Sequence, residues 1–284
     1  MKEAVLYTKE KGDKVRCSAC SHRCLISEGN VGICGVRKNI KGKLYLLVYG
    51  KIISQHIDPV EKKPLYHFLP GTKTYSIATV GCNFKCDFCQ NYDISQEKSI
   101  LGEEFKPEEI VEKAIKTGCK SIAYTYTEPT IFAEFVKDTA VLAKQKGLKN
   151  ILVTNGYMTS EFFEYLDGLI DAMNIDLKSF SNNFYKKTCK AKLQPVLDTI
   201  KLAKKKGIHL EITTLLIPGE NDSEKEIENI AKFIASVDNK IPWHISRFFP
   251  MYKMTGKPKT DIEKMKKAEE IGKKYLKHVY LGNI

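Results

Sequence analysis

Three cysteines lie close together in residues 82–89, CNFKCDFC, which we call the cluster loop. Their C-x3-C-x2-C spacing places three thiols on one short segment, and cysteine thiolates are the usual ligands of iron–sulfur clusters. A [4Fe-4S] cluster takes four ligands, so Cys82, Cys86 and Cys89 would leave its fourth iron open to a small molecule. The spacing therefore predicts a cluster that takes part in chemistry rather than one that only stores electrons.

A zinc site is the alternative for the same three thiols, because structural zinc is often held by closely spaced cysteines. Structural zinc takes four protein ligands, and the fourth would have to come from distant Cys119 or Cys189. Cys119 follows Gly118 just before an expected strand, and Cys189 lies in a lysine-rich stretch. Nothing in the sequence places either cysteine beside the cluster loop, so the pattern favours iron and sulfide over zinc.

A second cysteine group precedes the first and has four members, which we call the N-terminal cysteines: Cys17, Cys20, Cys24 and Cys34. Four thiolates close a tetrahedral site and leave no open position, which favours structural zinc. An auxiliary [4Fe-4S] cluster is the close alternative, since four thiolates also suit it. His22 could replace one thiolate, but we expect it to face solvent.

Alternating β-rich and helical segments follow from about residue 74. We expect strands at 75–80, 121–125, 150–153, 172–175, 208–213 and 243–246, and helices at 107–117, 129–146, 160–166, 194–205, 223–236 and 261–276. Six strand–helix repeats imply parallel strands with right-handed crossovers. No glycine-rich phosphate-binding motif is present, which argues against a Rossmann fold. The sequence therefore predicts an α/β fold, a partial (βα)6 TIM-like barrel, over residues 72–284.

Residues 1–71 differ in composition and are expected to form a small Cys-rich metal-binding domain. Two strand-like patterns, at 43–48 and 51–56, are separated by Tyr49-Gly50 and predict a hairpin. A proline-punctuated connector from residue 58 to residue 71 then leads to the barrel.

Polar side chains gather where the expected strands end, which is where α/β barrels place their active sites. The candidates are Thr127 and Glu128, Thr154 and Asn155, Asp176 and Lys178, and His244 and Arg247. The first expected strand opens directly into the cluster loop, so these groups and the three thiols should share one face of the barrel.

With these residues in place, the chain resembles the radical S-adenosylmethionine (radical SAM) enzymes, in the pyruvate formate-lyase activating enzyme-like branch. It is most similar to the radical SAM enzymes of the AmmeMemoRadiSam system. The matching segments are 34–37 (CGVR), 47–50 (LVYG), 58–68 (DPVEKKPLYHF), 81–91, 126–129 (YTEP), 154–156 (TNG) and 176–178 (DLK). The resemblance implies that SAM binds the open iron and is cleaved reductively to a radical that abstracts a hydrogen atom.

The resemblance also implies roles at the strand ends. In the activating enzymes a Gly-Gly-Glu segment binds the SAM ammonium; here Tyr126-Thr127-Glu128 occupies that place, so only the glutamate carries over. Glu128 could instead stabilise the start of the next helix. Thr154 and Asn155 suit the ribose hydroxyls, although Asn155 also belongs to an Asn-Gly turn dipeptide.

The remaining candidates have charges or rings suited to other parts of SAM. Lys178 could hold the SAM carboxylate with Asp176 orienting it, or the two could form only a salt bridge. Phe88 could pack against adenine. His244 and Arg247 could hold SAM or substrate, although His244 beside a tryptophan could also be a buried, satisfied histidine.

By analogy with the activating enzymes, we expect a protein or peptide substrate, and ferredoxin or flavodoxin as the electron donor. A radical SAM enzyme that modifies tRNA or other RNA is the alternative, supported by a formal net charge of +12. That charge is almost wholly lysine, which also suits a solvated surface. A zinc-binding interaction protein is a third reading.

The 284 residues are 43% hydrophobic and 28% charged, as in a globular protein. No apolar run is long enough to span a membrane, and the first residues lack the apolar core of a signal peptide. We therefore expect a cytoplasmic protein, in which nine cysteines indicate metal binding rather than disulfides.

Overall fold

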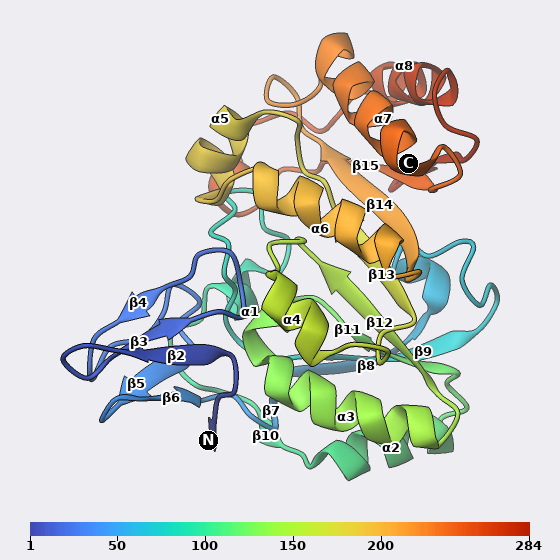
Figure 1. The fold of residues 1–284 in the computed structure, drawn as a ribbon. Coiled ribbons are helices and arrows are strands. Elements are labelled where there is room, and N and C mark those ends of the chain that lie inside the picture. The colour runs from blue at the N-terminus through green and yellow to red at the C-terminus, as the bar shows by residue number, and fades with distance from the viewer.

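The computed structural model describes residues 1–284 and is built around an eight-stranded sheet (Figure 1). The strand order is β16-β15-β14-β13-β12-β11-β9-β8. All neighbours are parallel except β8, which runs antiparallel to β9. The sheet stays open between β8 and β16, as in a partial barrel, so the predicted α/β fold is confirmed. The strands are β8 (Ser54–Pro59), β9 (Lys73–Ala78), β11 (Ser121–Tyr124), β12 (Lys149–Thr154), β13 (Ala172–Asp176), β14 (His209–Leu216), β15 (Trp243–Arg247) and β16 (Val279–Gly282).

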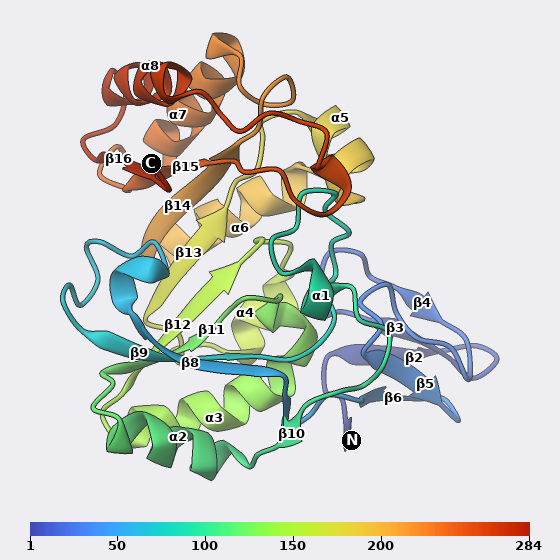
Figure 2. The same ribbon diagram turned by 180° about the vertical axis from the view of Figure 1, so that it is seen from behind.

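Helices between the parallel strands cover the outer face of the sheet (Figures 1 and 2). The start of α2 is fixed as the sequence predicts. Pro107 occupies the first turn, and the Glu109 carboxylate accepts a hydrogen bond from the Lys106 N–H at 2.6 Å. The helices are α1 (Tyr92–Ser95), α2 (Pro107–Lys116), α3 (Ala133–Gln145), α4 (Ser160–Tyr165), α5 (Asn182–Phe184), α6 (Gln194–Lys205), α7 (Glu224–Asp238) and α8 (Ile262–Lys273). Short 3-10 turns lie at Val60–Lys62, Pro129–Phe132 and Tyr252–Met254, and a π-helical turn lies at Tyr185–Cys189.

The central strands are buried on both faces. Every residue of β11 is buried, as expected where helices cover a parallel sheet. All six expected strands occur, and β16 adds a seventh parallel strand. Residues 279–282 are too few to show a clear apolar pattern, which is why the sequence did not predict β16.

The N-terminal unit consists of two small antiparallel sheets that lie beside the barrel (Figure 1). The first sheet has the order β1-β6-β5 and the second β2-β3-β4. Their strands are β1 (Lys2–Glu3), β2 (Tyr7–Glu10), β3 (Lys14–Cys17), β4 (Leu25–Ile26), β5 (Arg37–Ile40) and β6 (Lys43–Leu46).

The predicted hairpin of residues 43–48 and 51–56 is wrong. β6 pairs with β1 and β5 instead, β7 (Lys51–Ile52) pairs with β10 (Glu103–Glu104), and β8 joins the edge of the barrel sheet. An alternating pattern identifies a half-buried strand but does not identify its neighbour, which here lies elsewhere in the chain.

A buried ion pair joins the N-terminal unit to the barrel. The Arg37 guanidinium contacts the Glu134 carboxylate of α3 at 2.5 Å, and its Nε donates to the Ile131 carbonyl at 2.9 Å. Both charged side chains are almost fully excluded from solvent.

None of the helices combines the length and the apolar composition needed to cross a membrane.

Candidate active site

A cavity of about 560 Å³ opens at the carboxyl ends of the barrel strands. Its walls include most of the predicted site residues: Cys82, Cys86, Cys89, Phe88, Thr127, Glu128, Thr154, Asn155, Asp176, Lys178 and His244. Its volume is in the range of small-molecule sites. The structure thus brings the three thiols and the polar strand ends to one cavity.

Gly81 carries the chain from β9 into the cluster loop. Its backbone has a φ of +91°, and a Cβ there would lie 2.7 Å from the Cys34 carbonyl oxygen and 2.7 Å from a Val36 methyl group. A residue without a side chain is therefore required for the loop to start here. The contact also shows that the cluster loop rests directly on the segment that contains one of the N-terminal cysteines.

The thiols of the cluster loop receive polar contacts of the kind that surround iron–sulfur ligands. The Phe84 N–H donates to Cys82 Sγ at 3.4 Å, and Cys89 Sγ lies 3.2 Å from the Ser95 hydroxyl. An iron–sulfur cluster would take these thiols as its ligands. Burial raises the pKa of the Cys82 and Cys89 thiols, so iron must displace their protons. Three thiols facing an open cavity fit a cluster with one free iron.

Cys189 lies beside the cluster loop, contrary to its expected position. The neighbouring Cys189 thiol, followed by burial, raises the pKa of Cys86. Backbone bonds hold the two segments together, with the Lys85 N–H donating to the Cys189 carbonyl at 3.0 Å. The π-helical turn at 185–189 produces this contact, and no pattern in the sequence predicts it.

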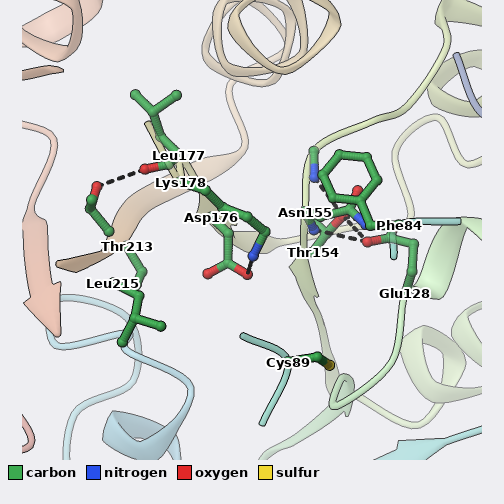
Figure 3. Close-up of polar contacts among 12 residues, drawn as sticks. Phe84, Cys89, Glu128, Thr154, Asn155, Asp176, Leu177, Lys178, Thr213 and Leu215 are labelled. Carbon is green, nitrogen blue, oxygen red and sulfur yellow. Dashed lines mark hydrogen bonds and ion pairs between the residues drawn. The ribbon is translucent and has the colours of Figure 1, made fainter. Parts of the chain in front are cut away.

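The Glu128 carboxylate is buried and accepts hydrogen bonds from three residues (Figure 3). The Thr130 N–H donates at 3.1 Å, the Thr154 hydroxyl at 2.8 Å and the Asn155 N–H at 2.8 Å. The first of these bonds caps the 3-10 turn at Pro129–Phe132. Burial raises the pKa of Glu128, although these bonds oppose the rise. Glu128 therefore ties the end of β11 to the end of β12, and no lysine, arginine or histidine forms an ion pair with it.

Asn155 connects this network to the cluster loop. Its Nδ2 donates to Asn83 Oδ1 at 2.7 Å and lies 3.9 Å from Cys82 Sγ. The following Gly156 has a φ of +71°, and a Cβ there would lie 2.7 Å from an Ile175 methyl group. The Asn-Gly pair thus makes the turn that the sequence suggests and also reaches a thiol. Thr127 is held nearby, its hydroxyl donating to the Thr79 carbonyl at 2.8 Å.

Asp176 and Lys178 form a salt bridge of 2.8 Å at the end of β13, and the pair lies across the cavity from Glu128 in Figure 3. Burial acts against the charge of Lys178, but the Asp176 carboxylate and the nearby Cys86 and Cys189 together outweigh it and hold the lysine pKa well above its ordinary value. The Lys178 ammonium also lies 5.6 Å from the centre of the Phe88 ring. The pair places both signs of charge at the thiol end of the cavity.

His244 lines the cavity, but its imidazole is occupied. Its Nε2 bonds with the buried Glu211 carboxylate at 2.7 Å. Arg247, which the sequence suggested for SAM or substrate, is not among the residues that line the cavity. Its Nε donates to the Thr260 carbonyl at 2.7 Å, and its guanidinium lies over the Phe249 ring. The strand register places residue 247 at the rim, where a loop carbonyl captures the side chain.

The opposite end of the cavity is formed by residues that were not predicted as site residues. The buried Lys63 ammonium contacts the Asp58 carboxylate at 2.7 Å and lies 4.3 Å from the centre of the Tyr126 ring. The Tyr126 hydroxyl also donates to Asp58 at 2.5 Å. Asp58 and Lys63 belong to the segment 58–68, whose similarity to a known family was the available signal. Glu61, Lys62 and Tyr66 of the same segment complete this wall.

The chain is similar in sequence to known proteins. Residues 76–234 match the model of the Radical SAM superfamily. The chain is 48% identical to protein MJ0808 of Methanocaldococcus jannaschii over 288 residues, which covers all of this chain and 86% of that protein. It is 32% identical over 214 residues to MJ1632 of the same organism, a protein named as a candidate glycyl-radical enzyme activating enzyme, with 72% of this chain and 78% of that protein covered. It is 25% identical to the pyruvate formate-lyase-activating enzyme of Clostridium pasteurianum, and the match covers 74% of this chain and 92% of that enzyme.

Solved structures share the fold. A radical SAM methyltransferase from Sphaerobacter thermophilus superposes with a TM-score of 0.59 at 16% identity, over 75% of this chain and 67% of that one. A domain of the pyruvate-formate lyase-activating enzyme from Bacteroides vulgatus superposes with a TM-score of 0.50 at 22% identity, over 57% of this chain and 99% of that one. At these identities the likeness concerns the fold alone.

Proposed function

Since this chain belongs to the radical SAM superfamily, we propose that it is an activase-like enzyme that cleaves SAM at a [4Fe-4S] cluster and takes a hydrogen atom from a protein substrate. The superfamily implies the cluster and SAM. Relatives named as activating enzymes support a protein substrate. When bound at Cys82, Cys86 and Cys89, the cluster would supply the electron for reductive cleavage of SAM, the chemistry by which a hydrogen atom could be removed from the substrate.

One observation carries the assignment of the cluster ligands. Cys82, Cys86 and Cys89 line the same cavity as the polar ends of β11, β12 and β13. A cluster held there would expose its open iron to the space that these strand ends surround. In our proposal the contacts from Phe84, Ser95 and Asn155 to the sulfur atoms stabilise the thiolates.

The charge of Glu128 supports a site for the SAM ammonium. A buried carboxylate is costly when no cation compensates it. Its hydrogen bonds from Thr130, Thr154 and Asn155 satisfy the oxygens but bring no positive charge. An ammonium group in the adjoining cavity would supply that charge, so we assign Glu128 to the amine end of SAM.

The other parts of SAM follow from the groups that remain. We assign the SAM carboxylate to Lys178, whose ammonium is held at the thiol end by Asp176. Thr154 and Asn155 lie between that point and Glu128 and suit the ribose hydroxyls. Phe88, which packs 6.0 Å from the Phe184 ring, offers an apolar surface for adenine.

We propose that the substrate contacts the wall formed by residues 61–66, and that it reaches this wall from the carboxyl ends of the strands, where the cavity opens. Lys62 is exposed there, and Tyr66 packs edge-on against His244 at 4.6 Å. We therefore assign His244, through Tyr66, to the substrate side of the cavity rather than to SAM.

The test is SAM cleavage by anaerobically reconstituted protein. With dithionite, or with reduced flavodoxin or ferredoxin as the physiological type of donor, we expect 5′-deoxyadenosine to form. The single variants Cys82→Ala, Cys86→Ala and Cys89→Ala should each abolish it, while Cys119→Ala, which changes a cysteine outside both groups, should not. Cleavage that survives loss of any of the three cysteines would refute the assignment.

The substrate class needs a separate measurement. We expect anaerobic pull-down to recover a protein that gains a glycyl radical, detected by electron paramagnetic resonance, only with this enzyme, SAM and reductant. Bulk tRNA binding measured across a salt series tests the RNA alternative, because phosphate contacts weaken steeply with salt. Tight, salt-dependent tRNA binding without any protein acceptor would overturn the protein substrate but not SAM cleavage.

A further inference from the structure

The N-terminal cysteines converge on a second, much smaller cavity. All four line it, together with apolar side chains that include Ala19, Ile26 and Ile131. We propose that these four cysteines bind one zinc ion, and that this metal fixes the surface on which the cluster loop rests. Zinc binding at this site does not depend on SAM chemistry and can be tested without it.

Two tight turns present the thiols to each other. In the first, the Cys17 N–H donates to the Cys24 carbonyl at 3.0 Å, and the Arg23 N–H donates to the Cys20 carbonyl at 3.0 Å. In the second, the Gly35 N–H donates to the Gly32 carbonyl at 2.9 Å, which brings Cys34 back toward the first turn. A Cβ on Gly32 would lie 3.7 Å from Cys24 Sγ and 3.8 Å from Cys34 Sγ, so the two turns meet at their sulfur atoms.

The size of the cavity favours a single ion over an auxiliary cluster. Its volume is about 10 Å³, which is roughly the space of one water-sized sphere. A cluster of four irons and four sulfides would need considerably more room than a lone ion. The thiols do not form a closed metal-binding group in this structure, so ion binding would draw them together.

The charge around the cavity also suits a metal thiolate. Four thiolates around a divalent ion have a net charge of about −2, and the buried Arg37 lines the same cavity.

The first turn is attached to the ends of the active-site strands. Cys20 forms a β-bridge with Met158, and the Ser21 N–H donates to the Tyr157 carbonyl at 3.0 Å. His22, which the sequence placed in solvent, lies on the cluster loop instead, with Nε2 2.8 Å from the Asn83 carbonyl oxygen. Together with the contact of Gly81 on Cys34, these bonds link the N-terminal cysteines to both flanks of the active site.

The experiment uses the triple variant Cys82→Ala/Cys86→Ala/Cys89→Ala, which cannot hold the active-site cluster. We expect about one zinc and almost no iron per chain by mass spectrometry of the metals, and four sulfur neighbours by X-ray absorption at the zinc edge. In the same background Cys17→Ser/Cys20→Ser should lose the zinc. Cys119→Ser and His22→Ala should keep it, since Cys119 lies elsewhere and His22 already bonds Asn83.

A second measurement covers variants that fail to fold. Zinc is removed from the folded triple variant with a strong chelator, and amide hydrogen exchange is followed with and without zinc added back. We expect exchange in residues 81–84 and 157–159 to become at least tenfold faster without zinc and to recover with it. About four irons and no zinc in the triple variant, no bound metal, or unchanged exchange at both segments would each overturn the proposal.

Discussion

Gly81 occupies a backbone conformation that residues with side chains rarely adopt, and it also lies against the Cys34 carbonyl. We expect Gly81→Ala to lower the free energy of unfolding by about 2–5 kcal/mol, from backbone strain of about 1–2 and overpacking of about 1–3. Gly147→Ala is the matched control, because Gly147 has a φ of +76° but no atom near its missing Cβ. Urea unfolding measures both; equal losses would show that the contact with Cys34 is unimportant.

A single substitution of Glu128 can separate a role in SAM binding from a role in stabilising the 3-10 turn at Pro129–Phe132. Glu128→Gln keeps the shape and removes the charge. A hydrogen bond to a charged group contributes about 1.5–3 kcal/mol, so we expect SAM affinity to fall roughly tenfold to a hundredfold by calorimetry. The exposed Glu164→Gln should leave affinity unchanged. If Glu128→Gln binds SAM normally and only unfolds more easily, the carboxylate serves the 3-10 turn alone.

At the scale of secondary-structure elements, a cluster of polar and charged groups around Glu211 joins β14 and β15. The Glu211 carboxylate of β14 accepts bonds from the Tyr66 and His67 N–H groups and contacts His209 and His244 at 3.0 and 2.7 Å. Burial alone would raise the pKa of Glu211, but these bonds lower it to about 2. The cluster thereby fastens the segment 58–68 to β14 and β15.

This lowered pKa predicts a pH dependence with a definite sign. A carboxyl group with a folded pKa below its unfolded value near 4.5 stabilises the protein above pH 4.5, and the contribution is lost as pH falls toward 2. The contribution is about 3 kcal/mol at neutral pH. We expect Glu211→Gln to be less stable than the unsubstituted protein at pH 7, with the difference shrinking between pH 4.5 and 2. A constant difference would mean that Glu211 does not titrate as described.

At the scale of the whole molecule, the ion pairs between the N-terminal unit and the barrel differ in burial. Arg37–Glu134 is buried, whereas Arg23–Glu161 keeps over a third of each side chain in solvent. Removing one partner of a buried pair costs about 3–5 kcal/mol, and exposed pairs contribute about 0–1. We therefore expect Arg37→Met to destabilise the protein strongly in urea unfolding and Arg23→Met hardly at all. Similar effects would show that docking does not depend on the buried pair.

The sequence was sufficient where the chemistry is local. The spacing of three thiols on one loop needs no partner to be recognised, and the end of each expected strand locates Glu128, Thr154 and Asp176 on one face. Short apolar runs that alternate with helical segments likewise predict the parallel strands of a partial barrel.

Contacts between distant segments were not predictable in the same way. Cys189 reaches Cys86 because of a π-helical turn, and Arg247 turns to a loop carbonyl thirteen residues ahead. β8 pairs with β9 rather than with the segment 43–48. Each outcome depends on which surfaces are buried together, and that is a property of the assembled chain.

The first turn of the N-terminal unit closes on a segment made much later during synthesis. The Thr159 hydroxyl donates to the Ser18 carbonyl at 2.6 Å across 141 positions of sequence. A ribosome adding roughly 5–20 residues per second needs about 7–28 s to cover that interval. Throughout this time the nascent chain presents its early thiols without the strand ends that later shield them. A metal ion bound during those seconds would protect the N-terminal thiols from oxidation. It would also let the N-terminal unit fold before the later strands pack against it.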